Sequence, residues 1–363
     1  MDHLFAACGF SRLIFEENHT TPMRLKFLFP LFISFGMIPG SCKNSKNIFQ
    51  DTSNKVSIIF DTDIGPDYDD VGALAILHSL ADNGECKILA TIASNKHKLI
   101  APVLDVINTY FHRPDLPIGV VRGEAVDVGA HQKWDSLIVA KYPHDIQSNA
   151  QASDALKLYR KLLSEQPDGS VTIVTVGFIT NMANLLKSAP DEISPLTGEQ
   201  LIKKKVKLLV SMAARFDHEM GKFKEFNVVK DASSSKIAFD GWPGPVIFSG
   251  FEIGMNIFTG LPIVNNQSIV NSPVKDVFAK SIPLDPNDAK GRMSWDETAV
   301  LVAVRGYQRY FDVVKGKILT NDDGTNGWDK NGARDLYLVQ KMPVHDIEKV
   351  LNDLIMHQPR IAN

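Results

Sequence analysis

The chain has 363 residues, 44% of them hydrophobic and 22% charged, which is a globular composition with enough apolar material for a large core. Its formal net charge is −3 and its acidic and basic residues are dispersed, so nothing in the charge pattern favours a nucleic-acid partner. The three cysteines (Cys8, Cys42 and Cys86) are too few for a disulfide framework and lack the spacing of a metal site, and we expect Cys86 to be a small, semi-buried residue.

The N-terminal region has the features of an export signal. Arg24 and Lys26 precede an apolar run over residues 27–38, which is too short to span a bilayer as a helix. Small residues then lead to Cys42, which is followed by the polar stretch "KNSKN". This pattern resembles a bacterial lipoprotein signal, although Pro39 stands where such signals usually have leucine. We therefore expect a lipid anchor on Cys42, in preference to an ordinary cleaved signal.

Four segments are expected on this basis. Met23 is a better start than Met1, so residues 1–22 are interpreted as an extension upstream of the true start. The remaining segments are a secretory or lipoprotein signal (23–42), a polar linker (43–55) and a folded domain (56–363). The mature protein is expected to be exported, either periplasmic or anchored to a membrane by its lipid.

From residue 56 onward, apolar runs alternate with amphipathic stretches. Strand-like runs occupy residues 56–63, 87–94, 116–123, 171–177, 206–213 and 245–250. Helical patterns lie between them at residues 69–82, 98–112, 151–164, 179–188 and 231–241. Short, nearly continuous apolar strands separated by helices predict right-handed βαβ units with strands buried on both faces. The predicted fold class is therefore α/β, a single domain with a Rossmann-like, mostly parallel central sheet and flanking helices.

After Gly250 the pattern becomes mainly helical. The stretch "DETAVLVAVRGYQRYF" predicts a helix over residues 296–311, and "PVHDIEKVLNDLIMH" predicts a closing helix over residues 343–357. Between them, the polar and glycine-containing residues 319–339 predict a turn-rich hairpin.

Polar or flexible residues follow the predicted strands. An aspartate cluster follows the first strand, and Asn95, Gly123 and Gly177 follow later ones. Ligands in open α/β sheets bind at the carboxyl ends of the strands. The sequence therefore places its candidate site at this edge of the sheet.

Five aspartates fall within ten residues in "DTDIGPDYDD": Asp61, Asp63, Asp67, Asp69 and Asp70. Carboxylates this close together repel one another unless a cation neutralises them. Oxygen-only clusters suit hard cations such as Ca²⁺, and the absence of interleaved histidine or cysteine argues against zinc. Helix capping and turn formation would explain one or two aspartates. Five of them predict a metal site.

The stretch "DTDIGPDYDDVGALAIL" resembles the opening motif of the inosine-uridine-preferring nucleoside hydrolase family, Asp-Thr-Asp-Pro-Gly-x-Asp-Asp-Ala. Four later blocks resemble family motifs in the right order: "ILATIASN", "VTIVTVGFITNMANLL", "KEFNVVKDASSSKIAF" and "SWDETAVL". Together these blocks cover roughly residues 56–304. The resemblance implies bound Ca²⁺, a nucleoside as the small-molecule substrate, hydrolysis of its N-glycosidic bond to ribose and free base, and a homo-oligomer.

The resemblance also implies roles for individual residues. Asp63 matches the aspartate that ligates calcium and takes a proton from the metal-bound water, and Asp70 matches a bidentate calcium ligand. The other implied calcium ligands are Asp296 and the backbone carbonyl of Val176, and the implied sugar contacts are Asp69, Asn95, Glu225 and Asn227. Glycoside hydrolysis passes through an oxocarbenium-like state, which carboxylates and firmly held sugar hydroxyls stabilise.

The sequence departs from the family pattern in two places. The opening loop is two residues longer, and we expect its extra carboxylate, Asp67, to face solvent. Trp295 stands where many members have the histidine that helps protonate the leaving purine. A tryptophan ring can stack on the base but cannot usefully donate a proton. His131 and His218 are the alternative candidates for the general acid.

Two other functions remain open from the sequence. A non-catalytic nucleoside- or sugar-binding lipoprotein would keep the metal and ribose contacts without the acid, and Trp295 favours it, whereas Asp63 counts against it. A haloacid-dehalogenase-type phosphatase would use Asp-x-Asp-x-Thr, but "DTDIG" has Gly65 in place of the threonine.

Overall fold

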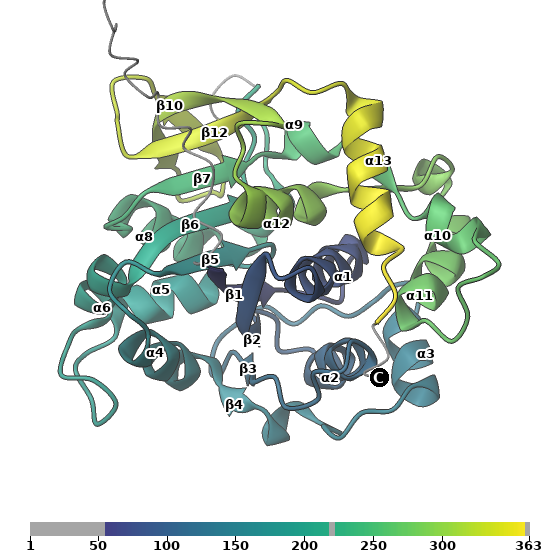
Figure 1. Ribbon diagram of the computed structural model, residues 1–363. Helices are drawn as coiled ribbons and strands as arrows, with labels where there is room; N and C mark the ends of the chain where they lie inside the picture. Colours follow the sequence, from purple (N-terminus) through teal and green to yellow (C-terminus); the bar gives the residue numbers. More distant parts are fainter. Residues whose placement is uncertain (1–54, 218–221, 360–363) are drawn as a thin grey trace, which may run out of the picture. The chain divides into compact units, whose positions relative to one another are not determined.

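The structure is a computed structural model that describes residues 55–217 and 222–359, which belong to one compact unit spanning residues 51–363. Within these residues lies a ten-stranded sheet in the order β11-β10-β12-β7-β6-β5-β1-β2-β3-β4 (Figure 1). Its strands are β1 (Val56–Thr62), β2 (Cys86–Ala93), β3 (Ile118–Val120), β4 (Ser153–Asp154), β5 (Val171–Thr175), β6 (Val206–Met212), β7 (Val246–Ser249), β10 (Phe311–Thr320), β11 (Asn326–Asp329) and β12 (Asp335–Gln340). In sheet order, the neighbouring strands β12, β7, β6, β5, β1, β2, β3 and β4 all pair in parallel. Strand β10 pairs antiparallel with both β11 and β12.

Strand β1 lies where the chain reverses its direction of travel through the sheet. It pairs in parallel with β2 on one side and with β5 on the other. The chain moves outward from β1 through β2, β3 and β4, then returns to β5 and continues the other way. A crevice forms at the carboxyl ends of the strands at such a reversal. The aspartate cluster that follows β1 therefore enters the crevice.

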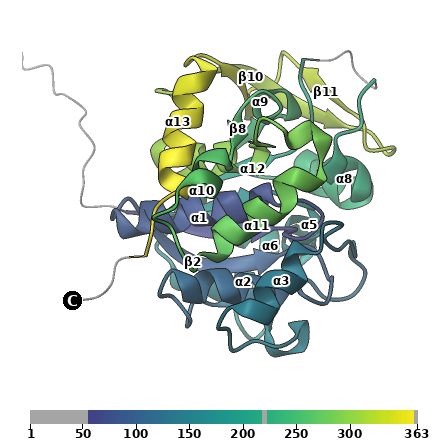
Figure 2. The ribbon, with the colours of Figure 1, turned by 90° about the vertical axis from the view of Figure 1, so that its right-hand side faces the viewer.

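Helices cover both faces of the sheet, as the two views show (Figures 1 and 2). Alternate β1 residues face opposite sides, so Ile58 and Phe60 pack in one apolar cluster and Ile59 packs in the other. The Ile59 side is covered by α4 (Ala155–Glu165), α5 (Thr180–Lys187), α6 (Gly198–Lys205) and α8 (Ala232–Gly241). The other side is covered by α1 (Asp69–Asp82), α2 (Ile100–Tyr110), α3 (Trp134–Lys141), α11 (Pro273–Ser281), α12 (Trp295–Arg305) and α13 (Val344–Ile355).

The predicted fold class is confirmed, and most predicted elements lie close to their expected bounds. The first helix occupies Asp69–Asp82, as predicted, and the hairpin region forms β10, β11 and β12. Burial raises the pKa of the Cys86 thiol to about 12, which agrees with an inert side chain.

The predicted helix over residues 296–311 is wrong at its C-terminal end. Helix α12 ends at Arg305 because Gly306 has a positive φ of 75°, and Phe311 begins strand β10. The pattern also missed several short elements: α7 (Phe226–Lys230), α9 (Phe251–Gly254), α10 (Leu261–Asn265), and the small sheet of β8 (Phe258–Thr259) and β9 (Arg292–Met293).

The predicted upstream extension, the export signal and Cys42 all lie outside the described residues, as does the predicted linker except for Lys55. In the part of the chain that the structure describes, no helix is long and apolar enough to cross a membrane.

Candidate active site

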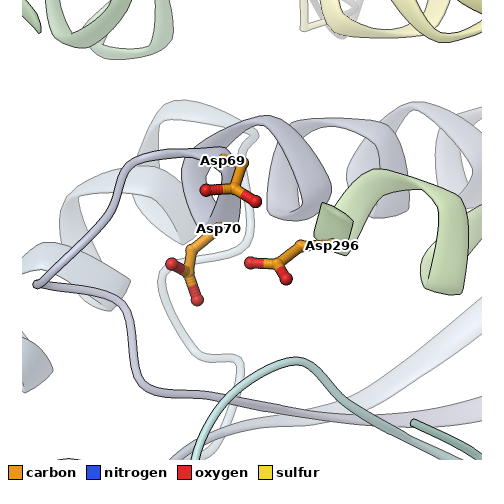
Figure 3. A group of neighbouring side chains, drawn as sticks. All are labelled: Asp69, Asp70 and Asp296. Atoms are coloured by element: carbon orange, nitrogen blue, oxygen red, sulfur yellow. The ribbon is translucent and has the colours of Figure 1, made fainter. Parts of the chain in front are cut away.

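The loop between β1 and α1 carries the acidic residues into the crevice. The Thr62 hydroxyl donates a hydrogen bond to the Asp70 carboxylate and accepts one from the Ile64 backbone N–H at 3.0 Å. These bonds close the loop tightly, so α1 begins with Asp69 and Asp70 in its first turn. Carboxylates there are stabilised by the positive end of the helix dipole. The local fold thus places these two aspartates next to each other and close to Asp296 (Figure 3).

A cavity of about 260 Å³ lies at the ends of β1 and β5. Its acidic lining consists of Asp63, Asp67, Asp69, Asp70, Glu225 and Asp296. Its other lining side chains include His131, Val176, Met212, Phe226, Asn227, Phe251 and Trp295. The lining therefore combines carboxylates with aromatic rings, a composition that suits a ligand with a polar part and a flat apolar part.

Burial and mutual repulsion act together on these carboxylates. Burial, followed by repulsion from Asp70, raises the pKa of Asp63 well above its usual range. Burial, followed by repulsion from Asp69, raises the pKa of Asp70 and of Asp296 in the same way. These groups can all be ionised together only if a cation offsets their repulsion.

The geometry of the site fits a hard metal cation. Asp69, Asp70 and Asp296 each have a carboxylate oxygen within 4.8 Å of the others, and all three are buried (Figure 3). Beside them, Oδ2 of Asp63 is buried and has no hydrogen-bond partner. An all-oxygen donor set with an unpartnered carboxylate oxygen is what Ca²⁺ or Mg²⁺ requires. The predicted ligands Asp70 and Asp296 come together here, and Asp69, predicted as a sugar contact, joins them.

Gly177 allows β1 and β5 to approach each other at the site. A Cβ atom at this position would lie 2.4 Å from the Asp63 backbone nitrogen and 2.6 Å from Asp63 Oδ1. The adjacent Val176, the predicted carbonyl ligand, lines the cavity, and its N–H donates to the Asp61 carbonyl at 2.8 Å. The absence of a side chain at Gly177 therefore allows the end of β5 to lie directly against Asp63.

We predict that Gly177→Ala destabilises the protein by about 1–3 kcal/mol, the usual cost of an added methyl group in a packed interior. Because the displaced atoms belong to Asp63, activity should fall several-fold more than the change in folded fraction explains. Chemical denaturation and initial rates would measure the two effects. Gly169→Ala is a useful comparison, since its Cβ would meet nothing within 4 Å and only its positive φ is strained. Equal losses of activity in the two variants would contradict the prediction.

The three other predicted sugar contacts differ in how many hydrogen bonds their side chains already form within the protein. Asn95 is fully buried: its Nδ2 donates to the Asp63 and Val128 carbonyls, and its Oδ1 accepts from two backbone N–H groups. Glu225 caps α7, and its two oxygens accept from three backbone N–H groups. Asn227 lines the cavity and donates to the Met212 carbonyl at 3.2 Å. Sugar binding by Asn95 or Glu225 stays a prediction, and it would require sharing or replacing these bonds.

Trp295 packs against Phe251 in the cavity lining. Its indole N–H donates to the Phe251 carbonyl at 2.8 Å, and its ring lies 5.1 Å from the Phe251 ring. Phe226 lies 38% exposed at the cavity. Of the two candidate acids, His131 is exposed and lines the cavity, whereas His218 lies outside the described residues. The Trp295 N–H is therefore already used in a hydrogen bond within the protein, whereas His131 is accessible to a ligand.

Asp67 does not simply face solvent, so that expectation is wrong. Its side chain is 49% exposed, but it lines the cavity and forms an ion pair with Arg292 at 2.9 Å. Arg292 was missed at the sequence level, although it lies three residues before Trp295 in "GRMSWDE". The aspartate cluster itself could have predicted a buried arginine, because a buried arginine offsets carboxylate repulsion as a metal does.

The metal-free protein is expected to lose stability as the pH rises. Burial raises the pKa of Asp61 and of Glu225 to about 7, and the pKa of Asp63 also rises. Between about pH 4 and pH 7 the unfolded chain has released these protons while the folded protein holds them, so stability falls with rising pH. With EGTA, the melting temperature should therefore be lower at pH 8 than at pH 5. Added Ca²⁺ should raise it more at pH 8, and an equal rise at both values would contradict this prediction.

Comparisons with known proteins identify one family from the sequence and similar folds among solved structures. The profile of the inosine-uridine preferring nucleoside hydrolases matches residues 58–341. Among solved structures, a plant nucleoside hydrolase is 17% identical with a TM-score of 0.63, and the match covers 83% of this chain and 99% of that one. A purine-preferring ribonucleoside hydrolase from Gardnerella vaginalis is 14% identical with a TM-score of 0.64 and the same coverage. The type III effector XopQ, complexed with adenosine diphosphate ribose, is 14% identical with a TM-score of 0.59, and the match covers 84% of this chain and 94% of that one. A search of curated proteins gave no match.

Proposed function

The chain belongs to the inosine-uridine preferring nucleoside hydrolase family, and from this premise we propose that it cleaves ribonucleosides to ribose and free base in the cavity described above. It is a hydrolase of the N-glycosidase class, and this membership removes the phosphatase alternative. The observation that carries the proposal is the crowding of buried carboxylates beside the unpartnered Asp63 oxygen in the cavity at the end of β1.

Asp63 is the residue best placed to act as the general base. Its Oδ2 is buried and unpartnered in the cavity lining, and its raised pKa reflects its affinity for a proton. It would accept a proton from the water that attacks the anomeric carbon. Asp69 and Asn227 line the same cavity and would hold the sugar hydroxyls while positive charge develops on the ring. Asp63 thus acts on the water and its neighbours on the sugar.

Calcium is the cation we propose for this site. Asp70 and Asp296, with Asp69 or Asp63, offer carboxylate oxygens, and Val176 offers a backbone carbonyl at the cavity wall. When bound, calcium supplies a positive charge that orients water and sugar hydroxyls and lowers the pKa of the water. The carboxylates need that charge, since burial and repulsion otherwise favour their protonated forms.

His131 is our candidate for the proton donor to the leaving base. It is exposed, and it lines the cavity together with the aromatic rings of Phe226, Phe251 and Trp295, on which a flat base would stack. His218 remains a second candidate. We expect His131→Ala to slow the release of a base that must be protonated and to leave activated leaving groups nearly unaffected.

One observation keeps a binding function as the second candidate. The Trp295 N–H is already bonded to the Phe251 carbonyl, so the residue at the family's usual acid position cannot protonate a base. A chain without another acid could hold a ribosyl ligand without cleaving it. The effector solved with adenosine diphosphate ribose shares the fold and has a ribosyl ligand.

The deciding experiment measures reducing sugar released from a panel of purine and pyrimidine nucleosides by the chain from Lys43 onward. The panel should include p-nitrophenyl β-D-ribofuranoside, whose leaving group needs no proton. EGTA treatment and Asp63→Asn should each abolish release, and Asp312→Asn, an exposed carboxylate on β10, should not. Release of sugar from nitrophenyl riboside alone would support hydrolase activity and show that the site has no general acid for a nucleobase. Tight nucleoside binding without release from any substrate would establish the binding protein.

We also propose that the chain is an exported bacterial protein with a lipid on Cys42, and that it assembles as a homo-oligomer. The motif around Cys42 and the family resemblance support these proposals. Cys42→Ser should move the expressed protein from the membrane fraction to the soluble fraction, and light scattering would give the oligomeric state.

A further inference from the structure

Arg292 lies beside the acidic cluster and pairs with two of its aspartates. Its side chain is only 6% exposed, yet it contacts carboxylates on three sides. Nε and Nη2 donate to Asp69 Oδ1 at 3.1 and 2.9 Å, Nη2 lies 2.9 Å from Asp67 Oδ1, and Nη1 lies 3.8 Å from Asp288 Oδ1. Within the described part of the chain, no lysine or arginine lines the cavity itself. Arg292 therefore supplies positive charge from behind the cavity wall.

Two aromatic rings lie against Arg292. The guanidinium carbon lies 5.0 Å from the Tyr68 ring centre and 5.1 Å from the Trp295 ring centre, which are cation–π distances. The Tyr68 hydroxyl donates in turn to Asp288. Asp67 and Tyr68 belong to the lengthened loop, and Trp295 replaces the usual histidine. All the departures from the family pattern thus meet at this one side chain.

The backbone around Arg292 is held as firmly as its side chain. Arg292 begins β9, and it pairs with Thr259 of β8 in the small antiparallel sheet. The preceding Gly291 has a φ of 111°, and a Cβ there would lie 2.5 Å from the Thr259 carbonyl oxygen. The guanidinium is therefore placed by both ends of its side chain, as a positioning group requires.

From these contacts we propose that Arg292 is a positioning residue that aims Asp69 at the sugar and fixes Trp295 as the wall of the base site. Both of its donors to Asp69 go to Oδ1, which leaves Oδ2 of Asp69 for the cavity. On this proposal, the lengthened loop contributes two of the contacts that hold Arg292, the ion pair with Asp67 and the ring of Tyr68. The inference rests on the proposed function, since it concerns the sugar and base contacts of that same site.

The test compares Arg292→Gln and Arg292→Lys with wild type, using p-nitrophenyl β-D-ribofuranoside and the nucleoside cleaved best. Arg292→Gln should lower kcat/KM by about 10- to 100-fold, the usual effect of losing a group that orients a site residue. Arg292→Lys, which keeps the charge but not the fork, should recover part of the loss. In an Asp69→Asn background, Arg292→Gln should lower kcat/KM much less than it does in wild type, because the two residues act through one contact.

A matched control separates positioning from folding. Arg160 is 1% exposed and donates to both oxygens of Asp191 at 2.7 and 2.8 Å, but it lies on α4, away from the cavity. Arg160→Gln should lower the melting temperature and leave kcat/KM of the folded enzyme unchanged. Calorimetric titration with Ca²⁺ alone should show that Arg292→Gln binds calcium at least as tightly as wild type, since a positive charge is removed.

Three results would overturn the inference: kcat/KM of Arg292→Gln within threefold of wild type, a full effect of that change in the Asp69→Asn background, or calcium affinity and melting temperature that fall in parallel. If wild type cleaves nothing, the hydrolase proposal fails by itself. Inosine binding by calorimetry then decides the inference, which requires weaker binding by Arg292→Gln. Equal or absent binding in both proteins would reject it.

Discussion

Asp63→Asn is expected to lower kcat by roughly 10³- to 10⁴-fold, the upper half of the range for losing a general base. The asparagine has nearly the same volume, and Asp63 is 4% exposed, so the change should be sterically silent. Its backbone carbonyl would still accept from Asn95 Nδ2 at 2.9 Å. The amide, however, cannot accept a proton from water at any pH near neutrality. Loss of activity without loss of structure is therefore the expected result.

Single-turnover kinetics with p-nitrophenyl β-D-ribofuranoside would isolate this effect, because the leaving group needs no acid. The melting temperature of metal-free Asp63→Asn should be equal to or higher than that of wild type, since one buried carboxyl with a raised pKa has been removed. Calcium affinity is measured on the same sample, to separate loss of the base from loss of the cation. Retention of more than a tenth of the wild-type kcat would show that another group accepts the proton.

The alternation of strands and helices was predictable because parallel strands buried on both faces carry a signal that local turns do not disturb. The β1 run and the Asp69–Asp82 helix are strongly patterned, and both lie where the pattern puts them. The end of α12 was not predictable from its apolar periodicity, because the stop depends on Gly306. The mispredicted residues 306–310 form a turn, and Phe311, the first residue of β10, is the one strand residue that the predicted helix included.

Local structure predicted the site where residues lie close together in sequence, and distant members such as Asp296 were predicted only through the family resemblance. Asp63, Asp69 and Asp70 share one loop and helix start, so their proximity follows from local structure. Arg292 reaches Asp69 across 223 positions, and no periodicity encodes that contact. The Asp67 prediction failed for the same reason, since its partner is Arg292.

In a His131→Ala background, Trp295→His is expected to raise the turnover of inosine by about 100-fold relative to nitrophenyl riboside, because a general acid contributes roughly 10²–10⁴-fold where a base must be protonated. The ratio of the two substrates is the measured quantity, since it cancels general losses of stability or sugar binding. Those losses are expected: the indole packs over Gly254, where a Cβ would lie 2.4 Å from it, and beside Arg292. A smaller imidazole leaves part of that space unfilled.

The size of the gain also identifies the acid that the chain now uses. If His131 already protonates the base, Trp295→His adds a second donor where one suffices, and the ratio changes little until His131 is replaced by alanine. If no acid is present, the full gain appears in the wild-type background and His131→Ala has no effect on the ratio. A small gain in both backgrounds would mean that base protonation is not the step that Trp295 governs. Trp295 would then shape the site for a ribosyl ligand whose leaving group departs without a proton. Phe226, Phe251 and Trp295, together with the buried carboxylates, could bind and cleave such a ligand without a general acid.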